Sequence, residues 1–389
     1  MLNQPMISML SSSPFEKKQN THLVLLCLMV PILLLSACGS DEPESDMPAL
    51  YRSVDVTPER VLVIEEDHDL IFGRIGSLTS DSDGDLYVGD NQMIHIKHFD
   101  RNGDFVGTIG REGRGPGEFS RITNMFIARD TLYAYDFDNA RLGRFVKNTS
   151  GILEFDNYLD IEMTDERHPR GVLKSKDHYV VESFTRSTED RPSTGQIALL
   201  GRDGTVMEPD FLDIPVPERV MITFDGMSGY VMKPFYRSSH YRLTPDDYFY
   251  YGWNDDLSID RIDMAGRVIN TIHFDVDPRP VTRQDISELS ERYPEQYWSS
   301  VRQHIPDTKP AFTNFLVDEH HRVWVNLSDI EHEDADKWIV LNQENDLVAS
   351  FDMIPNIYFY MVRDGLMYGI ERTEEELQRI VLYEVAIDN

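Results

Sequence analysis

Cysteine is scarce in this 389-residue sequence, and long hydrophobic runs are absent. The two cysteines, Cys27 and Cys38, both lie near the N-terminus, so residues 39–389 carry no thiol. Disulfide bonds, cysteine-ligated zinc and cysteine nucleophiles are therefore excluded from that part of the chain. The most apolar segment, Leu23–Leu35, is interrupted by Pro31 and falls short of the roughly 20 residues that a membrane-spanning helix needs. A permanent transmembrane anchor is thus the weaker interpretation.

The residues before Cys38 follow the order of a cleavable export signal. Lys17 and Lys18 precede the apolar segment, and small residues follow it in the tetrapeptide Leu35-Ser36-Ala37-Cys38. This order predicts a signal peptide over residues 1–37. The tetrapeptide also resembles the lipobox of bacterial lipoproteins, whose cysteine receives diacylglycerol and becomes the first residue of the mature chain. The resemblance implies that Cys38 is lipidated and binds the chain to a membrane. Ordinary cleavage after Ala37 is the alternative.

Acidic side chains dominate the charge of the remaining chain. Removing residues 1–37 takes away Lys17, Lys18 and Glu16, which leaves 35 basic and 67 acidic residues. Such a chain repels nucleic acid and anionic lipid head groups, so no nucleic-acid partner is expected. Residues 38–58 are predicted to be the lipidated cysteine and a disordered acidic spacer, because Gly39–Met47 has no apolar periodicity.

Acids directly after a lipidated cysteine also resemble the surface-export signal of Bacteroidetes lipoproteins. We therefore expect a lipoprotein of the cell envelope. Its anchor is expected in the outer membrane, on the periplasmic side or at the cell surface.

Strand-like alternation repeats along the rest of the chain, at a spacing of about 40 to 75 residues. In the first copy, Ser80–Gly110, the turn dipeptides Asp83-Gly84 and Asn102-Gly103 separate alternating apolar segments. Four further copies with varied turns contain Phe126–Gly151, Val172–Gly204, Tyr241–Phe274 and Phe315–Phe351. Each copy is too small to bury both of its faces alone, so the copies are predicted to be the blades of a propeller.

A sixth copy supplies three strands, at Tyr358–Val362, Leu366–Ile370 and Arg379–Val385. A spare strand, Arg60–Glu66, precedes the first copy. Pairing it with the sixth copy would complete that blade and leave no exposed edge. The sequence therefore predicts an all-β six-bladed propeller over residues 59–389, closed by its N-terminal strand.

Between the fourth and fifth copies, Val281–Pro306 has apolar residues at spacings of three or four. This is helical periodicity. We predict a short helical insertion at about 281–306, broken near Pro294 and lying over one end of the ring.

Two segments resemble a known family of propellers. Gly107–Phe119, with the sequence GTIGREGRGPGEF, resembles the blade linker of NHL-repeat-related six-bladed β-propeller lipoproteins of Bacteroidetes and their relatives. Lys309–Phe312, followed by Val323–Val325, is similar to another segment of that family. The resemblance extends from Arg60 to Ile387. It implies the fold, but little about activity, because most such proteins have no assigned activity.

Asp81, Asp83 and Asp85 alternate in a pattern whose oxygen atoms can surround a calcium ion. An EF-hand loop that began at Asp81 would need a glutamate at its twelfth position, where Gln92 stands. We interpret the segment as a hairpin turn whose Asp and Gly residues supply backbone caps and a positive φ. No metal site is predicted.

The histidines show no spacing typical of a zinc hydrolase; those considered are His95, His98, His320, His321 and His332. His320-His321 stands where other copies have Asp-Gly, so a turn is the simpler interpretation.

No catalytic motif stands out. Ser228-Gly229 is predicted to lie in a loop without a base, and no Gly-x-Ser-x-Gly elbow occurs. Gly110–Gly117 is rich in glycine but lacks Gly-Lys-Ser/Thr and joins two strands. A tight crossing between blades is therefore predicted in place of a phosphate loop. No cofactor is predicted, and no residue is assigned to catalysis.

A basic residue precedes the innermost strand in five of the predicted blades: Arg74, Arg121, Arg170, Arg237 and Lys309. In a propeller these strands begin around the central channel, so the five side chains are candidates for a partial cationic ring at one mouth. Such a ring would attract a small anionic ligand. The sixth blade departs from the pattern, with Pro355-Asn356 at the equivalent place. The alternative is that these residues cap strand ends or pair with the plentiful carboxylates.

Three functions stay open. The preferred one is a non-enzymatic, lipid-anchored binding module for a small anionic ligand, a glycan, a peptide or an envelope protein. The second is a metal-dependent enzyme of the lactonase or lyase kind, with Glu, Asn and Asp side chains from different blades around a metal in the channel. The third is a structural subunit of an outer-membrane complex. The fold alone does not choose among them.

Overall fold

The computed structural model describes residues 54–66, 68, 70–161, 167–185, 194–224, 227–327 and 335–387. The predicted signal peptide, Cys38 and most of the predicted spacer lie outside these residues. The described residues belong to one compact unit, Met47–Asn389. None of their helices has the length and apolar character needed to cross a membrane.

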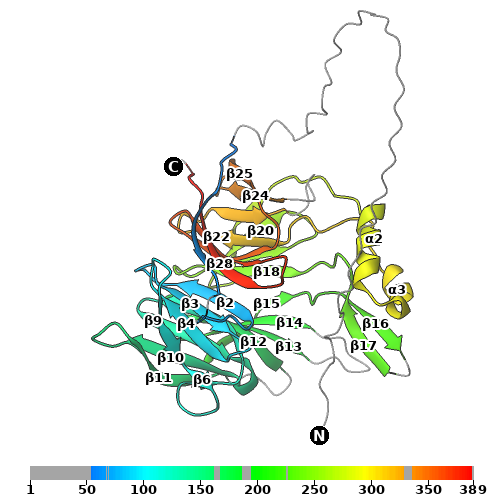
Figure 1. Cartoon of the computed structure of the whole chain (residues 1–389). Helices are drawn as coiled ribbons and strands as arrows, with labels where there is room; N and C mark the ends of the chain where they lie inside the picture. Colours follow the sequence, from blue (N-terminus) through cyan, green and yellow to red (C-terminus); the bar gives the residue numbers. More distant parts are fainter. Residues whose placement is uncertain are drawn as a thin grey trace, which may run out of the picture. The chain divides into compact units, whose positions relative to one another are not determined.

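Six four-stranded antiparallel sheets make up most of the described chain (Figure 1). Blade one contains β2 (Ile75–Ser80), β3 (Leu86–Asp90), β4 (His95–Phe99) and β5 (Phe105–Ile109). Blade two contains β8 (Ile122–Ala128), β9 (Thr131–Asp136), β10 (Arg141–Lys147) and β11 (Leu153–Asp160). Blade three contains β12 (Arg167–Lys174), β13 (Tyr179–Thr185), β14 (Gly195–Leu200) and β15 (Val206–Ile214).

Blade four contains β18 (Ser239–Leu243), β19 (Tyr248–Trp253), β20 (Ser258–Asp263) and β21 (Val268–His273). Blade five contains β22 (Asn314–Val317), β23 (Val323–Asn326), β24 (Asp336–Leu341) and β25 (Leu347–Met353). Blade six contains β26 (Ile357–Arg363), β27 (Leu366–Arg372), β28 (Gln378–Glu384) and the N-terminal strand β1 (Glu59–Ile64).

Turn chemistry explains why the strands lie where the sequence pattern predicts them. At the first turn of blade one, Asp81 Oδ1 accepts hydrogen bonds from the backbone N–H groups of Asp83 and Asp85, each at 3.0 Å. Gly84 has a φ of 88°, which residues with a side chain rarely adopt. The interpretation of this segment as a hairpin turn is confirmed.

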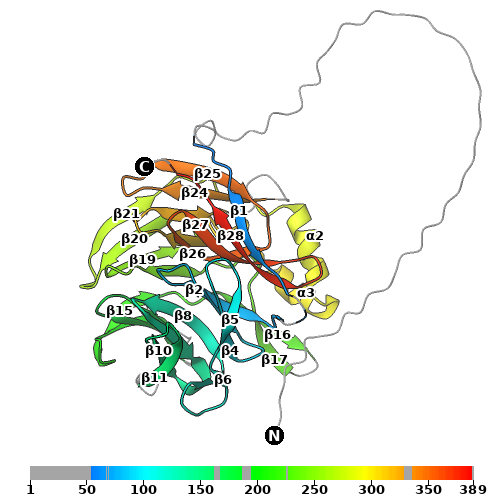
Figure 2. The ribbon, with the colours of Figure 1, turned by 60° about the vertical axis from the view of Figure 1, so that its left-hand side comes forward.

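The first strand of each blade lies at the centre of the ring. These innermost strands contact one another in the pairs β2 with β8, β8 with β12, β18 with β22, β22 with β26, and β26 with β2. β1 pairs antiparallel with β28, from Glu59 opposite Glu384 to Ile64 opposite Ile380 (Figure 2). The predicted six-bladed propeller and its closure by the N-terminal strand are confirmed.

The apolar core lies mainly between neighbouring blades. Blades five and six share a cluster that includes the buried rings of Trp324, Trp338, Phe351 and Phe359. Ile64 of β1 belongs to another cluster, which joins blade six to blade one. Burial of these apolar faces stabilises the ring, so each blade depends on its neighbours.

The predicted helical insertion consists of α2 (Arg283–Arg292) and α3 (Glu295–Arg302), between blades four and five. Thr282 caps α2, because its Oγ1 accepts the N–H of Asp285 at 3.1 Å and its own N–H donates to the Asp285 carboxylate at 2.7 Å. Pro294 is the N-cap residue of α3. The insertion and its break are therefore where the sequence predicts them.

A hairpin outside the predicted blade pattern lies between blades three and four. Its strands β16 (Arg219–Phe224) and β17 (Met227–Met232) are paired, and α3 packs against β16 (Figure 1). Ser228 and Gly229 therefore lie on a strand, and the prediction of a loop at this place is wrong. The extended backbone is stabilised because its polar groups pair with those of β16.

Residues 54–58, the end of the predicted spacer, lie against blade five. Ser350 on β25 donates its N–H to the carbonyl of Val54 and accepts the N–H of Val56, each at 2.9 Å. Asp55 forms a parallel bridge with Ser350. The edge of β25 thus supplies partners for the backbone groups of Val54 and Val56.

The glycine-rich linker folds back on itself between blades one and two. β6 (Arg111–Glu112) pairs in parallel with β7 (Glu118–Phe119). Gly110 has a φ of 71°, and a Cβ atom added there would lie 2.4 Å from the ring of Phe119. The predicted tight crossing between blades is confirmed, and glycine is needed where the backbone approaches that ring.

Candidate functional site

An acid or amide at the end of the second strand fixes the start of the innermost strand in three blades. The side-chain oxygens of this residue accept hydrogen bonds of 2.7–3.1 Å from backbone N–H groups just before or at the start of that strand. Asp90 accepts from Gly73 and Arg74, Asp136 accepts from Ser120 and Arg121, and Asn254 accepts from Ser238. We call the end of the ring where the innermost strands begin the mouth face. Repetition of this contact in blades one, two and four makes the mouth face a fixed surface around the channel.

The five basic residues predicted for a cationic ring lie at or before the innermost strands. Arg74 and Arg121 directly precede β2 and β8, and Arg237 comes just before β18. Arg170 lies within β12, at an irregularity of its pairing with β13. Lys309 lies on the segment between α3 and β22.

Several of these side chains are engaged by neighbouring groups. Three are paired with carboxylates: Arg121 with Asp138, Arg237 with Asp255 at 2.7 Å, and Lys309 with Asp285 at 2.7 Å. Arg170 lies over the ring of Phe184, with its guanidinium carbon 5.0 Å from the ring centre. Arg74 is exposed. The alternative of local pairing thus accounts for three members, and the cationic ring stays a prediction.

The mouth face is hollowed by a cleft between blades five and six. Its volume is about 490 Å³, within the range of roughly 300–1,000 Å³ that is usual for small-molecule sites. Six buried residues form its floor: Asn314, Asn326, Trp338, Ile357, Phe359 and Ile370. Six less buried residues form its rim: Thr313, Asp336, Asn356, Tyr358, Arg372 and Gln378.

These residues lie near the starts of β22, β24, β26 and β28, or near the ends of β23 and β27. Because all these strand ends meet on the mouth face, the cleft belongs to that face. We refer to it below as the five-six cleft.

The five-six cleft lies where the cationic pattern is interrupted. Asn356, from the Pro355-Asn356 pair that replaces the basic residue in blade six, lines the cleft and has a φ of 68°. The absence of a basic residue at Pro355-Asn356 was the one feature of the sequence that pointed to the five-six cleft. The other residues of the cleft were missed, because a polar residue near a strand end resembles an ordinary cap.

Two amides fix the walls of the cleft to neighbouring blades. Asn314 Oδ1 accepts a hydrogen bond from Arg242 of blade four, and its Nδ2 donates to the carbonyl of Phe359 in blade six at 3.1 Å. Gln378 Oε1 accepts the N–H of Ile75 in blade one at 2.8 Å. The cleft is therefore held in place by contacts that extend over four consecutive blades.

Trp338 brings an unpaired donor to the floor of the cleft. Its side chain is 1% exposed, stacks on Phe351 with ring centres 6.3 Å apart, and meets Phe359 edge-on at 5.5 Å. Its Nε1 has no hydrogen-bond partner among the residues that the structure describes. A buried donor without an acceptor costs about 1–3 kcal/mol. The indole thus contributes its ring to the floor, while its N–H is enclosed by the surrounding side chains.

A second polar group lies between blades three and four. Glu182 on β13 hydrogen-bonds to the hydroxyl of Tyr241 on β18. Burial raises the pKa of Glu182, although Tyr241 and Arg170 act in the opposite direction. Burial also lowers the pKa of His240 to about 4. Arg170 is therefore attracted by the carboxyl group of Glu182, and its guanidinium is less available to an anionic ligand.

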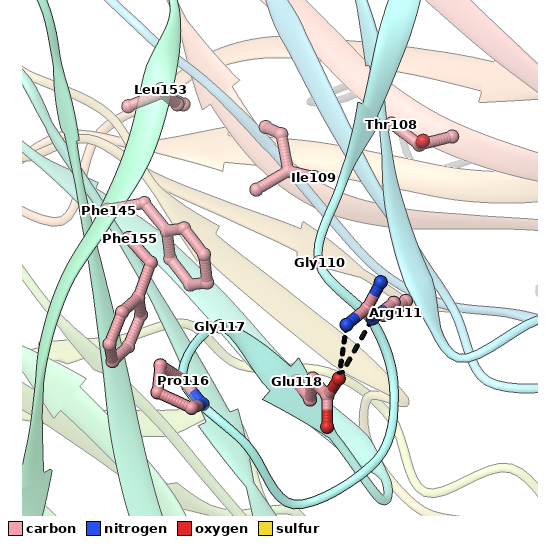
Figure 3. Close-up of a pocket in the computed structure, with 10 residues that line it drawn as sticks. All are labelled: Thr108, Ile109, Gly110, Arg111, Pro116, Gly117, Glu118, Phe145, Leu153 and Phe155. Carbon is pink, nitrogen blue, oxygen red and sulfur yellow. Dashed lines mark hydrogen bonds and ion pairs between the residues drawn. The ribbon is translucent and has the colours of Figure 1, made fainter.

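The glycine-rich linker borders a smaller cavity of about 330 Å³, shown in Figure 3. Phe145 and Phe155 present their rings on one side, and the side chains of Arg111 and Glu118 meet on the other. Arg111 Nε lies 2.8 Å from Glu118 Oε1, and Glu118 Oε2 accepts the N–H of Gly115 at 2.8 Å. The polar groups of this cavity are thus engaged in holding the linker.

The aspartates of the first turn are also bound by protein groups. Lys147 Nζ lies 2.8 Å from Asp81 Oδ2 and 3.1 Å from Asp83 Oδ2. Asp85 Oδ2 lies 3.0 Å from His98 Nε2. Within the described ranges, no group of three or more His, Cys, Asp or Glu side chains is placed to hold a metal ion.

The His320-His321 pair lies in the turn between β22 and β23, as predicted. His321 Nδ1 lies 3.0 Å from the hydroxyl of Tyr250, so this turn contacts blade four. His332 falls outside the described residues.

Comparisons with known proteins agree with the fold. Residues 55–155 match a protein family described as a 6-bladed beta-propeller. A comparison with curated proteins found no match.

Two solved structures cover most of the chain. One is a Bacteroides fragilis protein whose name describes it as exported, with 13% identity, a TM-score of 0.50, and coverage of 89% of this chain and 98% of that one. The other is a member of the duf4221 family from Bacteroides vulgatus, with 12% identity, a TM-score of 0.51, and coverage of 85% and 99%. At these identities the likeness shows the fold alone.

Proposed function

We propose that this chain is an exported bacterial lipoprotein whose propeller is a non-catalytic binding module. The predicted signal peptide and the lipobox-like tetrapeptide ending in Cys38 support export and lipid anchoring. The name of the similar Bacteroides fragilis protein agrees with export. The anchor would hold the module in the outer membrane, on the periplasmic side or at the cell surface.

The five-six cleft is the proposed ligand site. The observation that carries this proposal is a preformed cavity of about 490 Å³ on the mouth face, whose walls are fixed by Asn314 and Gln378. A preformed cavity of this size with convergent polar groups is a common form of small-molecule site. Binding in it needs no catalytic group.

Anchoring is tested by exchanging cysteines in the native host. Cys38→Ser should abolish incorporation of labelled fatty acid and move the protein to the soluble fraction. Cys27→Ser is the matched control, and it should remain lipidated, because the predicted cleavage removes Cys27. A mature wild-type chain that begins with unmodified Cys38 would contradict lipidation and support ordinary cleavage after Ala37.

Binding is tested with the mature Cys38→Ser chain, which needs no detergent, against sugars, amino acids, short peptides and carboxylates. A ligand at 100 times its Kd should stabilise the fold by about 2.7 kcal/mol, visible as a rise in Tm. Tyr358→Ala in the cleft should reduce the rise by about half, as a tenfold weaker Kd implies, while Tyr230→Ala should not, because that exposed tyrosine lies on β17. A rise that is undiminished in Tyr358→Ala, or turnover of the ligand, would contradict the proposal.

A further inference from the structure

The charges around the five-six cleft favour an uncharged ligand. Asp336 and Arg372 are the two charged residues among those that line it, so their formal charges cancel. Arg372 also lies 3.0 Å from Glu376. The chain as a whole carries a formal charge of −31, which repels anions from its surface. An anionic ligand would therefore have little to hold it in this cleft.

The polar groups of the cleft match hydroxyl groups. Asn356 is exposed, and its side chain has no hydrogen-bond partner among the residues described. An amide offers both N–H donors and a carbonyl acceptor, and a hydroxyl group likewise donates and accepts. The amide of Asn356 can therefore bond to a ligand hydroxyl group in either direction.

Tyr358 supplies an aromatic surface at the rim. Its side chain is 54% exposed and forms an edge contact with Tyr360, with ring centres 4.8 Å apart. An exposed tyrosine presents a rigid apolar ring together with a polar tip. The ring of Trp338 cannot serve as such a surface, because it is buried between Phe351 and Phe359.

We infer that the five-six cleft binds a neutral carbohydrate, a mono- or disaccharide unit of a glycan, and this inference rests on the proposed function. A sugar ring has an apolar C–H face, which suits Tyr358, and a rim of hydroxyl groups, which suits the exposed amide of Asn356. The volume of about 490 Å³ gives room for a ligand of this class.

Calorimetric titration of the mature Cys38→Ser chain with a panel of neutral mono- and disaccharides tests the inference. One neutral sugar should bind, and the uronic acid of the same configuration should bind about tenfold more weakly, equivalent to ~1.4 kcal/mol. Asn356→Gly should weaken binding of the neutral sugar about tenfold, because glycine keeps the positive φ of this position while the amide is lost. Tyr358→Ala should weaken it by a similar factor, and Tyr230→Ala should leave it unchanged.

The outcomes separate the inference from the proposed function. If amino acids, peptides or carboxylates bind in the cleft and neutral sugars do not, the carbohydrate assignment is overturned and the binding module stands. If a neutral sugar binds Tyr358→Ala and Asn356→Gly as tightly as it binds the wild type, its site is elsewhere and the inference fails. If no class of ligand shows cleft-dependent binding, both proposals fail.

Discussion

Trp324 and Trp338 are neighbouring buried side chains of blade five that differ in one interaction. Trp324 donates its Nε1–H to Asp318 at 2.9 Å, whereas the Nε1–H of Trp338 has no acceptor among the described residues. Replacing either by phenylalanine removes the same volume. Trp324→Phe also breaks a hydrogen bond to a buried carboxylate, and such bonds contribute about 1.5–3 kcal/mol.

We therefore expect Trp324→Phe to lower the free energy of unfolding by about 1.5–3 kcal/mol more than Trp338→Phe does. Equilibrium unfolding in guanidinium chloride, with the ligand absent, measures the difference. Equal losses would indicate that the N–H of Trp338 is satisfied in the free protein by an ordered water.

Asp90 and Lys97 form a buried ion pair in blade one, with Nζ 2.7 Å from Oδ2. Burial by itself raises the pKa of Asp90, but the hydrogen bonds from Lys97 and from backbone N–H groups outweigh it and hold the pKa well below its usual value. Asp90→Asn leaves the Lys97 charge buried without a counterion. We expect it to lower the free energy of unfolding at pH 7 by about 3–5 kcal/mol.

The sign of the pH dependence follows from the lowered pKa. The contribution of Asp90 is complete above its unfolded pKa of about 3.9 and is lost as the pH falls toward its folded pKa. The difference in Tm between wild type and Asp90→Asn should therefore narrow below about pH 4. Glu376→Gln, in the exposed pair with Arg372, is the control and should change stability by less than about 1 kcal/mol at any pH. If the difference in Tm between wild type and Asp90→Asn stays constant from pH 7 to pH 3, the charge of Asp90 does not contribute to stability.

Among the elements, the strands could be predicted where turn chemistry is local. Asp83-Gly84 and Asn102-Gly103 contain within a few residues the positive φ and side-chain caps that end one strand and begin the next. The β16–β17 hairpin carries the same kind of local signal in the sequence, Asp225-Gly226 between Phe224 and Met227, but it stands outside the repeating blade pattern and was therefore missed. Its position also depends on packing against α3, which lies about 70 residues further along the chain.

The single strand β1 completes blade six and joins it to blade one. Its strand covers the edge of β28, and Glu65 just after it lies 2.6 Å from Arg379. Ile64 joins the apolar cluster between blades six and one. Removal of β1 would expose both a sheet edge and this cluster.

A chain that begins at residue 67 should therefore lose cooperative unfolding, while a chain that begins at Val54 should keep the Tm of the mature protein. Circular dichroism during heating measures both. Adding a synthetic peptide with the sequence of residues 59–66 should restore a transition to the shorter chain. An unchanged Tm in the shorter chain would contradict closure by β1.

The five-six cleft is built from parts of the chain that are far apart in sequence. Its lining runs from Thr313 to Gln378, and its wall is fixed to Ile75 near the other end of the described chain. No sequence spacing encodes such a site, since its residues come together only when the ring closes. The predicted cationic ring illustrates the same difficulty: the sequence placed its members near strand starts, but not the acids that pair with Arg121, Arg237 and Lys309.

The net charge of the molecule gives a last prediction. A formal charge of −31 means that acidic groups repel one another over the surface, and folding brings them closer together. Salt screens this repulsion strongly, because the Debye length falls from about 30 Å at 0.01 M to about 3 Å at 1 M. Buried pairs such as Asp90 with Lys97 are screened much less.

We therefore expect the Tm of the mature Cys38→Ser chain to rise by about 2–4 °C between 0.01 and 0.5 M NaCl, equivalent to ~1–2 kcal/mol. Scanning calorimetry at pH 7 measures the rise. The double variant Glu374→Gln/Glu375→Gln, at two exposed positions after β27, should reduce the response to salt, because it removes two of the repelling charges. A Tm that falls with salt would mean that exposed ion pairs, such as Arg379 with Glu65, outweigh the general repulsion.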